Sequence, residues 1–269
     1  MEVVIFKNAD NVASRGAGLV AEMLNVKPDA VFGFATGSTP IDLYRNLVAR
    51  HRKGELSFRH TTSFNLDEYM GIAADNPQSY RTFMNREFFD HVDIDKNKTH
   101  LPACESSENP QLVGPEYEAK IEQVGGIDLQ ILGIGYNGHI GFNEPSSSLS
   151  SRTRVKTLTR RTLEDNSRMF TDGEFQPKLA ITMGIGTIME ARRILLLATG
   201  KSKADAVAAM VEGPVTAMCP ASVLQMHERV TVLIDEQAAA GLKYREYYDL
   251  AHRENRALKE RFGEFYASG

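Results

Sequence analysis

The residues best suited to chemistry lie in one glycine-rich stretch, residues 133–145, with the sequence Gly-Ile-Gly-Tyr-Asn-Gly-His-Ile-Gly-Phe-Asn-Glu-Pro. This stretch places His139 and Glu144 five positions apart. An imidazole beside a carboxylate can transfer protons, because the carboxylate fixes the tautomer of the ring. The apolar residues 128–132 predict a buried strand just before it. We therefore expect the pair to face a crevice at the carboxyl end of a strand, where open α/β sheets bind their ligands.

The same stretch also fits the dinucleotide-binding pattern G-x-G-x-x-G, through Gly133, Gly135 and Gly138. That pattern requires a helix that opens at the third glycine and an acidic residue roughly 20 positions further on. Gly141 and Pro145 break any helix here, and the downstream stretch is basic. We therefore reject a nicotinamide or flavin site.

Two adjacent acids, Asp67 and Glu68, follow a strand predicted over residues 61–66. Acids at the carboxyl end of a strand suggest proton chemistry. Successive side chains of a strand point to opposite faces, so at most one of the two can face a crevice. We expect Asp67 to be that group and Glu68 to have a structural or helix-starting role.

Two strand-loop-helix turns could bind a phosphate. In residues 36–40, Thr-Gly-Ser-Thr-Pro, Thr39 suits a helix N-cap and Pro40 the first helical turn. Free backbone N–H groups would then favour an anion, although an ordinary capped helix gives the same pattern. The second turn, residues 199–203, lacks the glycine that a nucleotide-triphosphate loop needs. Lys203 at a helix start opposes the dipole, so an anion-binding role explains it better.

Three cations, Arg152, Arg154 and Lys156, alternate along the strand-like residues 151–156 and would share one face. Such a face either binds an anion or keeps an edge strand soluble, and the pattern leaves both interpretations open. Arg168 is a further candidate anion ligand.

Composition restricts the class of protein. The chain has 269 residues, 25% of them charged, and a net charge of -4. This length suits one large domain, residues 1–269, and the charge does not suit a general nucleic-acid binder. No apolar stretch is long enough for a membrane span and no secretory signal is found, so we expect a cytoplasmic protein. Cys104 and Cys219 match no zinc or C-x-x-C pattern.

Strand-like and helix-like segments alternate along the chain. This alternation predicts a single-domain α/β fold with a largely parallel open sheet and helices on both faces. Strands are predicted over residues 3–6, 30–35, 61–66, 128–132, 193–198 and 230–234. Helices are predicted over residues 9–25, 40–52, 79–90, 115–124, 203–212 and 236–260, the last as a solvated helix with no chemistry.

Five runs of this sequence resemble the glucosamine-6-phosphate deaminase (isomerase) family, in the order in which the family has them. They are residues 36–40, 64–69, 138–145, 151–157 and 183–187. The resemblance extends nearly end to end and implies a Rossmann-like fold of the sugar-phosphate isomerase type. It also implies conversion of D-glucosamine 6-phosphate and water to D-fructose 6-phosphate and ammonia, in the catabolism of N-acetylglucosamine, with no cofactor and no metal.

The resemblance also implies roles for single residues. Asp67 matches the base that moves a proton between C2 and C1 through an enolamine, His139 matches the group that assists ring opening, and Glu144 orients and polarises that histidine. The residues that match the ligands of the substrate phosphate are Gly37, Ser38, Thr39, Arg168 and Lys203. Asn137 stands where many members have aspartate and others asparagine. It adds no negative charge, so we expect it to stabilise protonated His139 less than an aspartate would.

Regulated members of the family bind N-acetylglucosamine 6-phosphate between the subunits of a hexamer. The matching residues here are Ser147, Ser148, Arg154 and Lys156, so activation is a hypothesis, and we expect a homo-oligomer that is a hexamer if it is regulated. Two rivals remain. A 6-phosphogluconolactonase shares the fold and the phosphate loop but does not need the motif around Asp67. A sugar-phosphate sensor would carry a DNA-binding helix pair, which is absent from the predicted elements.

Overall fold

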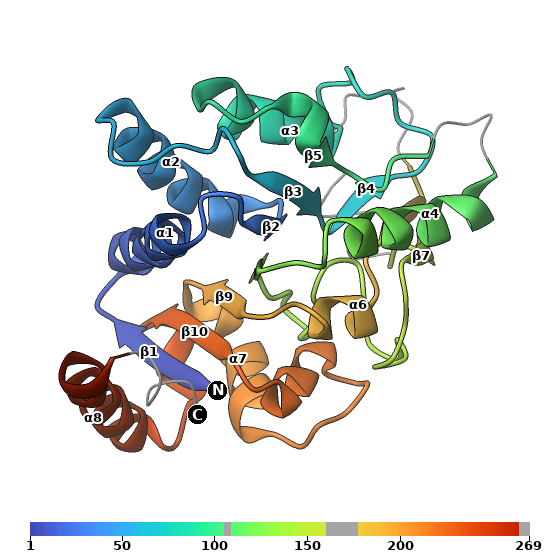
Figure 1. Cartoon of the computed structure of the whole chain (residues 1–269). Coiled ribbons are helices and arrows are strands. Elements are labelled where there is room, and N and C mark those ends of the chain that lie inside the picture. Colours follow the sequence, from blue (N-terminus) through green and yellow to red (C-terminus); the bar gives the residue numbers. More distant parts are fainter. Residues whose placement is uncertain (105–108, 160–176, 264–269) are drawn as a thin grey trace.

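Parallel strands form the main sheet of the computed structural model, which describes residues 1–104, 109–159 and 177–263 (Figure 1). Each strand predicted from the sequence lies within one or two residues of an observed one, and all pairings in this sheet are parallel. The predicted α/β fold is thereby confirmed. In spatial order the strands are β1 (Glu2–Phe6), β10 (Val230–Asp235), β9 (Ile194–Ala198), β6 (Leu129–Leu132), β2 (Val31–Phe34), β3 (Thr62–Asn65) and β5 (Thr99–His100).

Helices cover both faces of this sheet, because side chains along each strand alternate between two hydrophobic cores. In β9, Leu195 and Leu197 belong to one core and Ile194 and Leu196 to the other. The first core also contains buried residues of α1 (Ala9–Val26), α2 (Ser38–Arg52) and α3 (Tyr80–Glu87). The second contains residues of α4 (Pro110–Gln123), α6 (Ile185–Met189) and α7 (Ala204–Glu212). Figure 1 shows the two helix layers on opposite sides of the strands.

A buried aromatic cluster holds α2 and α3 against the end of β2. The ring of Phe88 stacks on Tyr44 at 5.1 Å and meets Phe34 and Phe58 edge-on at 5.4 and 5.1 Å. The hydroxyl of Tyr44 donates to the Ala35 carbonyl oxygen over 2.6 Å. The helix and the loop that follows β2 are therefore fixed to each other.

A second, antiparallel sheet lies beside the first and was not foreseen. It has the order β4 (Asp67–Tyr69), β8 (Leu179–Thr182), β7 (Arg154–Thr157). Thr182 is paired with Asp67 on one side and with Arg154 on the other. Only β7 was anticipated from the sequence, as the strand-like residues 151–156. Strand β4 is polar, and the apolar run of β8 is too short to identify a strand from the sequence.

Several predicted boundaries are wrong. Helix α2 begins at Ser38, so its N-cap is Gly37 and not Thr39. Gly37 has a φ of 110°, a backbone conformation that a threonine would not adopt easily. Helix α4 begins at Pro110, five residues before the predicted start, and contains Pro115 within it. Strand β7 begins at Arg154, three residues late.

The C-terminal segment is two elements rather than one helix over 236–260. A short 3-10 helix, η5 (Ala238–Gly241), precedes α8 (Arg245–Phe262), which has no buried residue and lies beside β1. The solvated character predicted for α8 is confirmed. Of the helices that the structure describes, none is long and apolar enough to cross a bilayer. The other 3-10 helices are η1 (Phe89–His91), η2 (Lys96–Lys98), η3 (Lys201–Lys203) and η4 (Pro220–Met226).

We expect Phe88→Ala to lower the free energy of unfolding by about 3–5 kcal/mol, because it removes the ring at the centre of the aromatic cluster and leaves a cavity. Denaturant unfolding measures the change. Tyr247→Ala removes a ring that is 64% exposed and should change stability by no more than about 0.5 kcal/mol. Similar losses in the two variants would contradict this account of the core.

Candidate active site

A cavity of about 340 Å³ lies at the carboxyl ends of β2, β3, β6 and β9, which are neighbours in the sheet. Each of the four loops that follow these strands contributes to its lining. Asp67 comes after β3 and His139 after β6, so the structure brings together two groups that are 72 positions apart in the chain. Asp67 and His139 line this cavity, whereas Glu144, which was expected to face the crevice with His139, is not among the lining residues. The lining residues are Ala35, Thr36, Gly37, Ser38, Thr39, Pro40, Leu66, Asp67, Tyr80, Gly133, Ile134, Gly135, Tyr136, His139, Gly141, Phe142 and Lys203.

One end of the cavity suits an anion. Helix α2 begins there without a side-chain cap within the described residues, so the backbone N–H groups of its first turn remain available beside the cavity. Lys203 lines the same cavity, and its ammonium donates to the Ile134 carbonyl oxygen over 2.7 Å. A helix N-terminus and a lysine that meet at one place favour a phosphate group. Arg168, the remaining predicted anion ligand, lies outside the described residues.

Asn137 links the two members of the imidazole-carboxylate pair. His139 Nδ1 lies 3.4 Å from Glu144 Oε2, an oxygen that accepts a 2.8 Å hydrogen bond from Asn137 Nδ2. The side-chain oxygen of Asn137, Oδ1, accepts in turn from the backbone N–H of His139 over 3.3 Å. His139 Nδ1 is buried with no hydrogen-bond partner in the described part of the chain. Buried polar atoms are nearly always bonded, and catalytic hydrogen bonds often tighten only when substrate binds.

Glycines in the loop allow this packing. A Cβ atom at Gly135 would lie 2.2 Å from His139 Cε1, so only glycine leaves room for the imidazole. Gly141 has a φ of 55°, and a Cβ atom there would lie 2.9 Å from Thr182 Oγ1 and 3.2 Å from Asp67 Oδ2. The loop that carries His139 therefore rests directly against Asp67.

Asp67 is almost fully buried, with 5% of its surface exposed. Burial raises the pKa of Asp67 to about 8, and the nearby charge of Glu68 adds to the rise. Hydrogen bonds from the Phe142 backbone and the Thr182 hydroxyl oppose it without cancelling it. A carboxylate with such a pKa is a stronger base than an ordinary aspartate and titrates near the pH of the cell.

Glu68 has the structural role expected for it. Its Oε1 accepts from the backbone N–H groups of Tyr69 and Tyr80 at 2.9 and 3.0 Å, and its Oε2 accepts from that of Arg81 at 2.9 Å. It thus bonds two residues at the start of α3 and points away from the cavity that Asp67 lines.

The expectation that three cations share one face is wrong for Arg152. It precedes β7 and forms ion pairs with Glu118 and Glu190. Arg154 donates to Asn143 Oδ1 over 2.9 Å.

The four candidates for the regulatory site lie near the loop that carries His139 and Glu144 or within the residues that follow it. Burial and the charge of Arg154 lower the pKa of Lys156, and Glu144 opposes that shift. Arg154 and Lys156 therefore approach the loop that carries His139 and Glu144. Ser147 is buried, and its hydroxyl has no hydrogen-bond partner within the described ranges, whereas Ser148 is exposed.

Three residues at or beside the site were not found from the sequence. Tyr80 lines the cavity from α3, Thr182 bonds both Asp67 and Phe142, and Asn143 accepts from Arg154. Asn143 lies within the glycine-rich stretch, so its position was a signal. Tyr80 and Thr182 carried none, since tyrosine and threonine are common in cores and strands. In the described part of the chain no cluster of histidine, cysteine and acidic side chains could hold a metal ion.

Comparison with known proteins identifies the relationship. The sequence pattern of the family described as glucosamine-6-phosphate isomerases/6-phosphogluconolactonase matches residues 7–233. A glucosamine-6-phosphate deaminase of Colwellia psychrerythraea is 60% identical over 266 residues, which cover 99% of each chain. This chain belongs to the glucosamine-6-phosphate deaminase family. A solved structure of a monomeric glucosamine-6-phosphate deaminase is 43% identical and superposes with a TM-score of 0.86, covering 90% of this chain and 100% of that one.

Lactonases are more distant from this member of the family. A 6-phosphogluconolactonase from Leishmania guyanensis has a TM-score of 0.69 over 90% of this chain and 98% of its own, but only 20% identity. That likeness shows the shared fold alone. The fold therefore does not separate deaminase from lactonase, whereas the sequence identity does.

The pKa of Asp67 predicts how stability depends on pH. An aspartate whose folded-state pKa is raised from 3.8 to about 8 opposes folding once it ionises, so its contribution to stability falls as pH rises through this interval. Asp67→Asn cannot ionise. We therefore expect the melting temperature of this variant, relative to that of the wild type, to increase from pH 5 to about pH 8 and then to level off.

Thermal denaturation across this pH range measures the difference. Asp29→Asn removes an exposed carboxylate and serves as the control, for which the difference from wild type should stay constant. A difference that stays constant for Asp67→Asn as well would show that its carboxyl group titrates normally.

Proposed function

We propose that this chain converts D-glucosamine 6-phosphate and water to D-fructose 6-phosphate and ammonia, as a hydrolase of a C–N bond that also isomerises the sugar. One observation carries the proposal: Asp67, His139 and the uncapped N-terminus of α2 open onto one cavity. The 60% identity to a protein named glucosamine-6-phosphate deaminase over 99% of both chains supports the same activity.

The substrate phosphate is bound at the first turn of α2, by the backbone of Gly37, Ser38 and Thr39, together with Lys203. The helix dipole and the lysine charge favour a dianion, and Arg168 is the further ligand implied by the family resemblance. The cavity then leaves the sugar carbons between Asp67 and His139, which line it beyond the phosphate loops.

Ring opening is assigned to His139. The imidazole takes the proton of the C1 hydroxyl and returns a proton to the ring oxygen, so the C1–O5 bond breaks and an aldehyde forms. Glu144, 3.4 Å from Nδ1, stabilises the imidazolium that exists between the two transfers. Asn137 holds the carboxylate in place through its 2.8 Å hydrogen bond without adding charge.

Isomerisation is assigned to Asp67. Its carboxylate takes the proton from C2, the C2–H electron pair forms the C1–C2 double bond, and the C1 carbonyl pair moves to O1. O1 gains a proton as the substrate ammonium loses one, which gives the enolamine. The same carboxyl group then returns its proton to C1 while the nitrogen lone pair forms the C2 imine. The C2 imine that results adds water and expels ammonia, which leaves the ketone of fructose 6-phosphate. The raised pKa of about 8 makes Asp67 basic enough for this step, and the substrate ammonium favours its ionised form.

The wild type should release equal amounts of fructose 6-phosphate and ammonia from glucosamine 6-phosphate. Asp67→Asn should lower kcat by about 10²–10⁴-fold, because it removes the base but keeps its size. Binding of the substrate, measured by calorimetry, should change little because the phosphate loops are intact. No turnover by the wild type would leave the fold standing and favour the lactonase or the sensor instead.

Regulation and assembly belong to the same proposal. Activation by N-acetylglucosamine 6-phosphate would use Ser147, Ser148, Arg154 and Lys156, and the approach of both cations to the loop of Glu144 supports a link to the active site. The related monomeric deaminase means that family membership does not fix the subunit number. A homo-oligomer, which is a hexamer if regulated, therefore stays a prediction, as do a single domain over residues 1–269 and a cytoplasmic location.

If the activator site is present, N-acetylglucosamine 6-phosphate should convert a sigmoidal rate curve into a hyperbolic one, because it favours the conformation that binds substrate. Initial rates with and without this compound, together with the molar mass from light scattering, test it. A hyperbolic curve that the compound leaves unchanged would rule out activation.

A further inference from the structure

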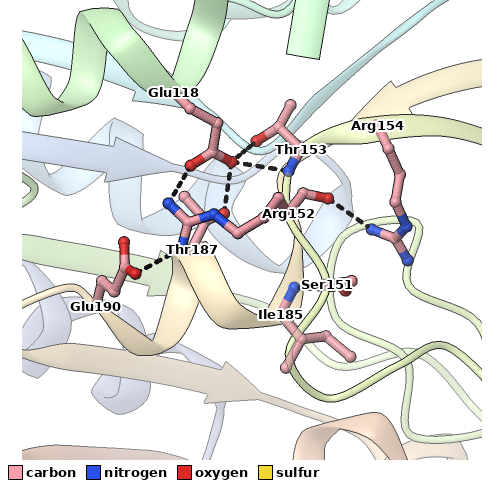
Figure 2. Close-up of polar contacts among 8 residues, drawn as sticks. All are labelled: Glu118, Ser151, Arg152, Thr153, Arg154, Ile185, Thr187 and Glu190. Carbon is pink, nitrogen blue, oxygen red and sulfur yellow. Dashed lines mark hydrogen bonds and ion pairs between the residues drawn. The ribbon is translucent and has the colours of Figure 1, made fainter. Parts of the chain in front are cut away.

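Glu118, a residue of α4 that does not line the active-site cavity, accepts hydrogen bonds from three residues, Arg152, Thr153 and Thr187. Its Oε1 accepts from the Thr153 backbone N–H at 2.7 Å, from the Thr187 hydroxyl at 2.6 Å and from the Thr153 hydroxyl. Its Oε2 accepts from the guanidinium of Arg152. Figure 2 shows these contacts converging on one carboxylate from the start of β7 and from α6.

This carboxylate is ionised and largely enclosed. Only 14% of its side chain is exposed. Burial raises the pKa of Glu118, but hydrogen bonds from Thr153 and Thr187 and the charge of Arg152 outweigh it, so the pKa lies below its ordinary value. Moving any one donor away from this buried charge costs free energy, because the charge is then incompletely compensated. The donors are therefore held in place.

Two glycines allow the backbone of α4 and the residue before α6 to approach the same segment closely. A Cβ atom at Gly114 of α4 would lie 2.2 Å from the Thr153 carbonyl oxygen, and one at Gly184, just before α6, would lie 2.0 Å from that of Ser151. The Ser151 carbonyl also accepts from the Gly186 N–H over 2.8 Å. Residues 151–153 are therefore fixed on both sides, with Glu118 as the polar contact.

The fixed segment leads directly to the catalytic loop. Arg154 follows it, and its guanidinium donates to the Arg152 carbonyl at 3.2 Å and to Asn143 Oδ1 at 2.9 Å (Figure 2 for the first contact). The Asn143 amide donates to the carbonyl groups of Ile140 and Met183 at 2.9 and 2.8 Å. Asn143 is fully buried and next to Glu144, and Ile140 is next to His139, so this amide joins the two ends of the loop that carries the pair.

A second route leads to the base. Across the antiparallel sheet Arg154 is paired with Thr182, and Thr182 with Asp67. The Thr182 hydroxyl bonds Asp67 and accepts from the Phe142 N–H at 3.1 Å. The start of β7 thus sets the register in which the loop and the base meet.

We propose that Glu118 is a positioning residue of the active site: by fixing residues 151–153 it places Arg154, and through Asn143 and Thr182 it sets the geometry of His139, Glu144 and Asp67. This inference rests on the proposed deaminase activity. Its consequence is that a side chain with no contact to substrate controls the rate of the chemical steps and leaves the phosphate-binding loops unaffected.

The test compares Glu118→Gln with Glu190→Gln in the whole chain. Glu190 also pairs with Arg152, but its side chain is 65% exposed and it does not bond Thr153 within the described residues, so it is a matched loss of charge. We expect Glu118→Gln to lower kcat by about 10- to 100-fold, as displaced catalytic groups do, with KM within about threefold of wild type. Glu190→Gln should keep wild-type kcat and KM.

A double-mutant cycle tests the route. If the effect passes through Arg154, the losses in kcat caused by Glu118→Gln and Arg154→Met should not multiply in the double variant, because both act on the same link. Losses that multiply would overturn the route. All rates are measured well below the melting temperature of each variant, and circular dichroism confirms that each is folded.

A purely structural role predicts a different result. Glu118→Gln would then melt earlier but show wild-type kcat when folded, and this outcome would overturn the proposal. If Glu118→Gln does not fold, Thr153→Val removes one donor only and should lower kcat about threefold with KM unchanged; unchanged kcat there also overturns the proposal. Absence of ammonia release by the wild type would instead defeat the deaminase assignment, so the two failures are distinguishable.

Discussion

The enclosure of Asp67 is the constraint on which the rest of the site depends. Asp67 begins β4 of the antiparallel sheet and its carboxyl group is buried beside the glycine-rich loop, and this burial raises its pKa to about 8. A base of that strength requires neighbours that exclude water yet leave one side open to the cavity. Gly141 meets the first requirement, because a larger residue would collide with Thr182 and press on Asp67. The position of β4 at the end of β3 meets the second.

The two sheets meet at this carboxylate and contribute differently to the site. The parallel sheet supplies the cavity and the helix N-terminus that suits a phosphate, since loops at the carboxyl ends of neighbouring strands converge there. The small antiparallel sheet supplies register: Asp67, Thr182 and Arg154 face one another across three strands. Lactonases share the fold at 20% identity, so the parallel sheet alone does not define the chemistry.

The polar contacts around the loop form a connected set rather than isolated pairs. Asn137 bonds His139 and Glu144, Asn143 bonds Ile140 and Met183, and neither amide carries charge. Neutral amides can orient a carboxylate and close a loop without altering its charge balance. Glu118 and Arg152, whose contact is between opposite charges, lie further out and do not line the cavity.

The sequence by itself determined the main sheet, its alternation with helices and the positions of Asp67, His139 and Glu144 at strand ends, because hydrophobic periodicity and glycine turns are local properties. It also indicated the structural role of Glu68. It did not reveal the antiparallel sheet, the start of α2 at Ser38 or the separation of Arg152 from Arg154 and Lys156. The sheet and the position of Arg152 depend on contacts between segments distant in the chain, whereas the helix start depends on the positive φ of Gly37. Only the tertiary structure decided that Thr182 lies between Asp67 and Arg154, and that Glu118 holds the segment leading to them, because strand register and buried hydrogen bonds form only when the elements pack.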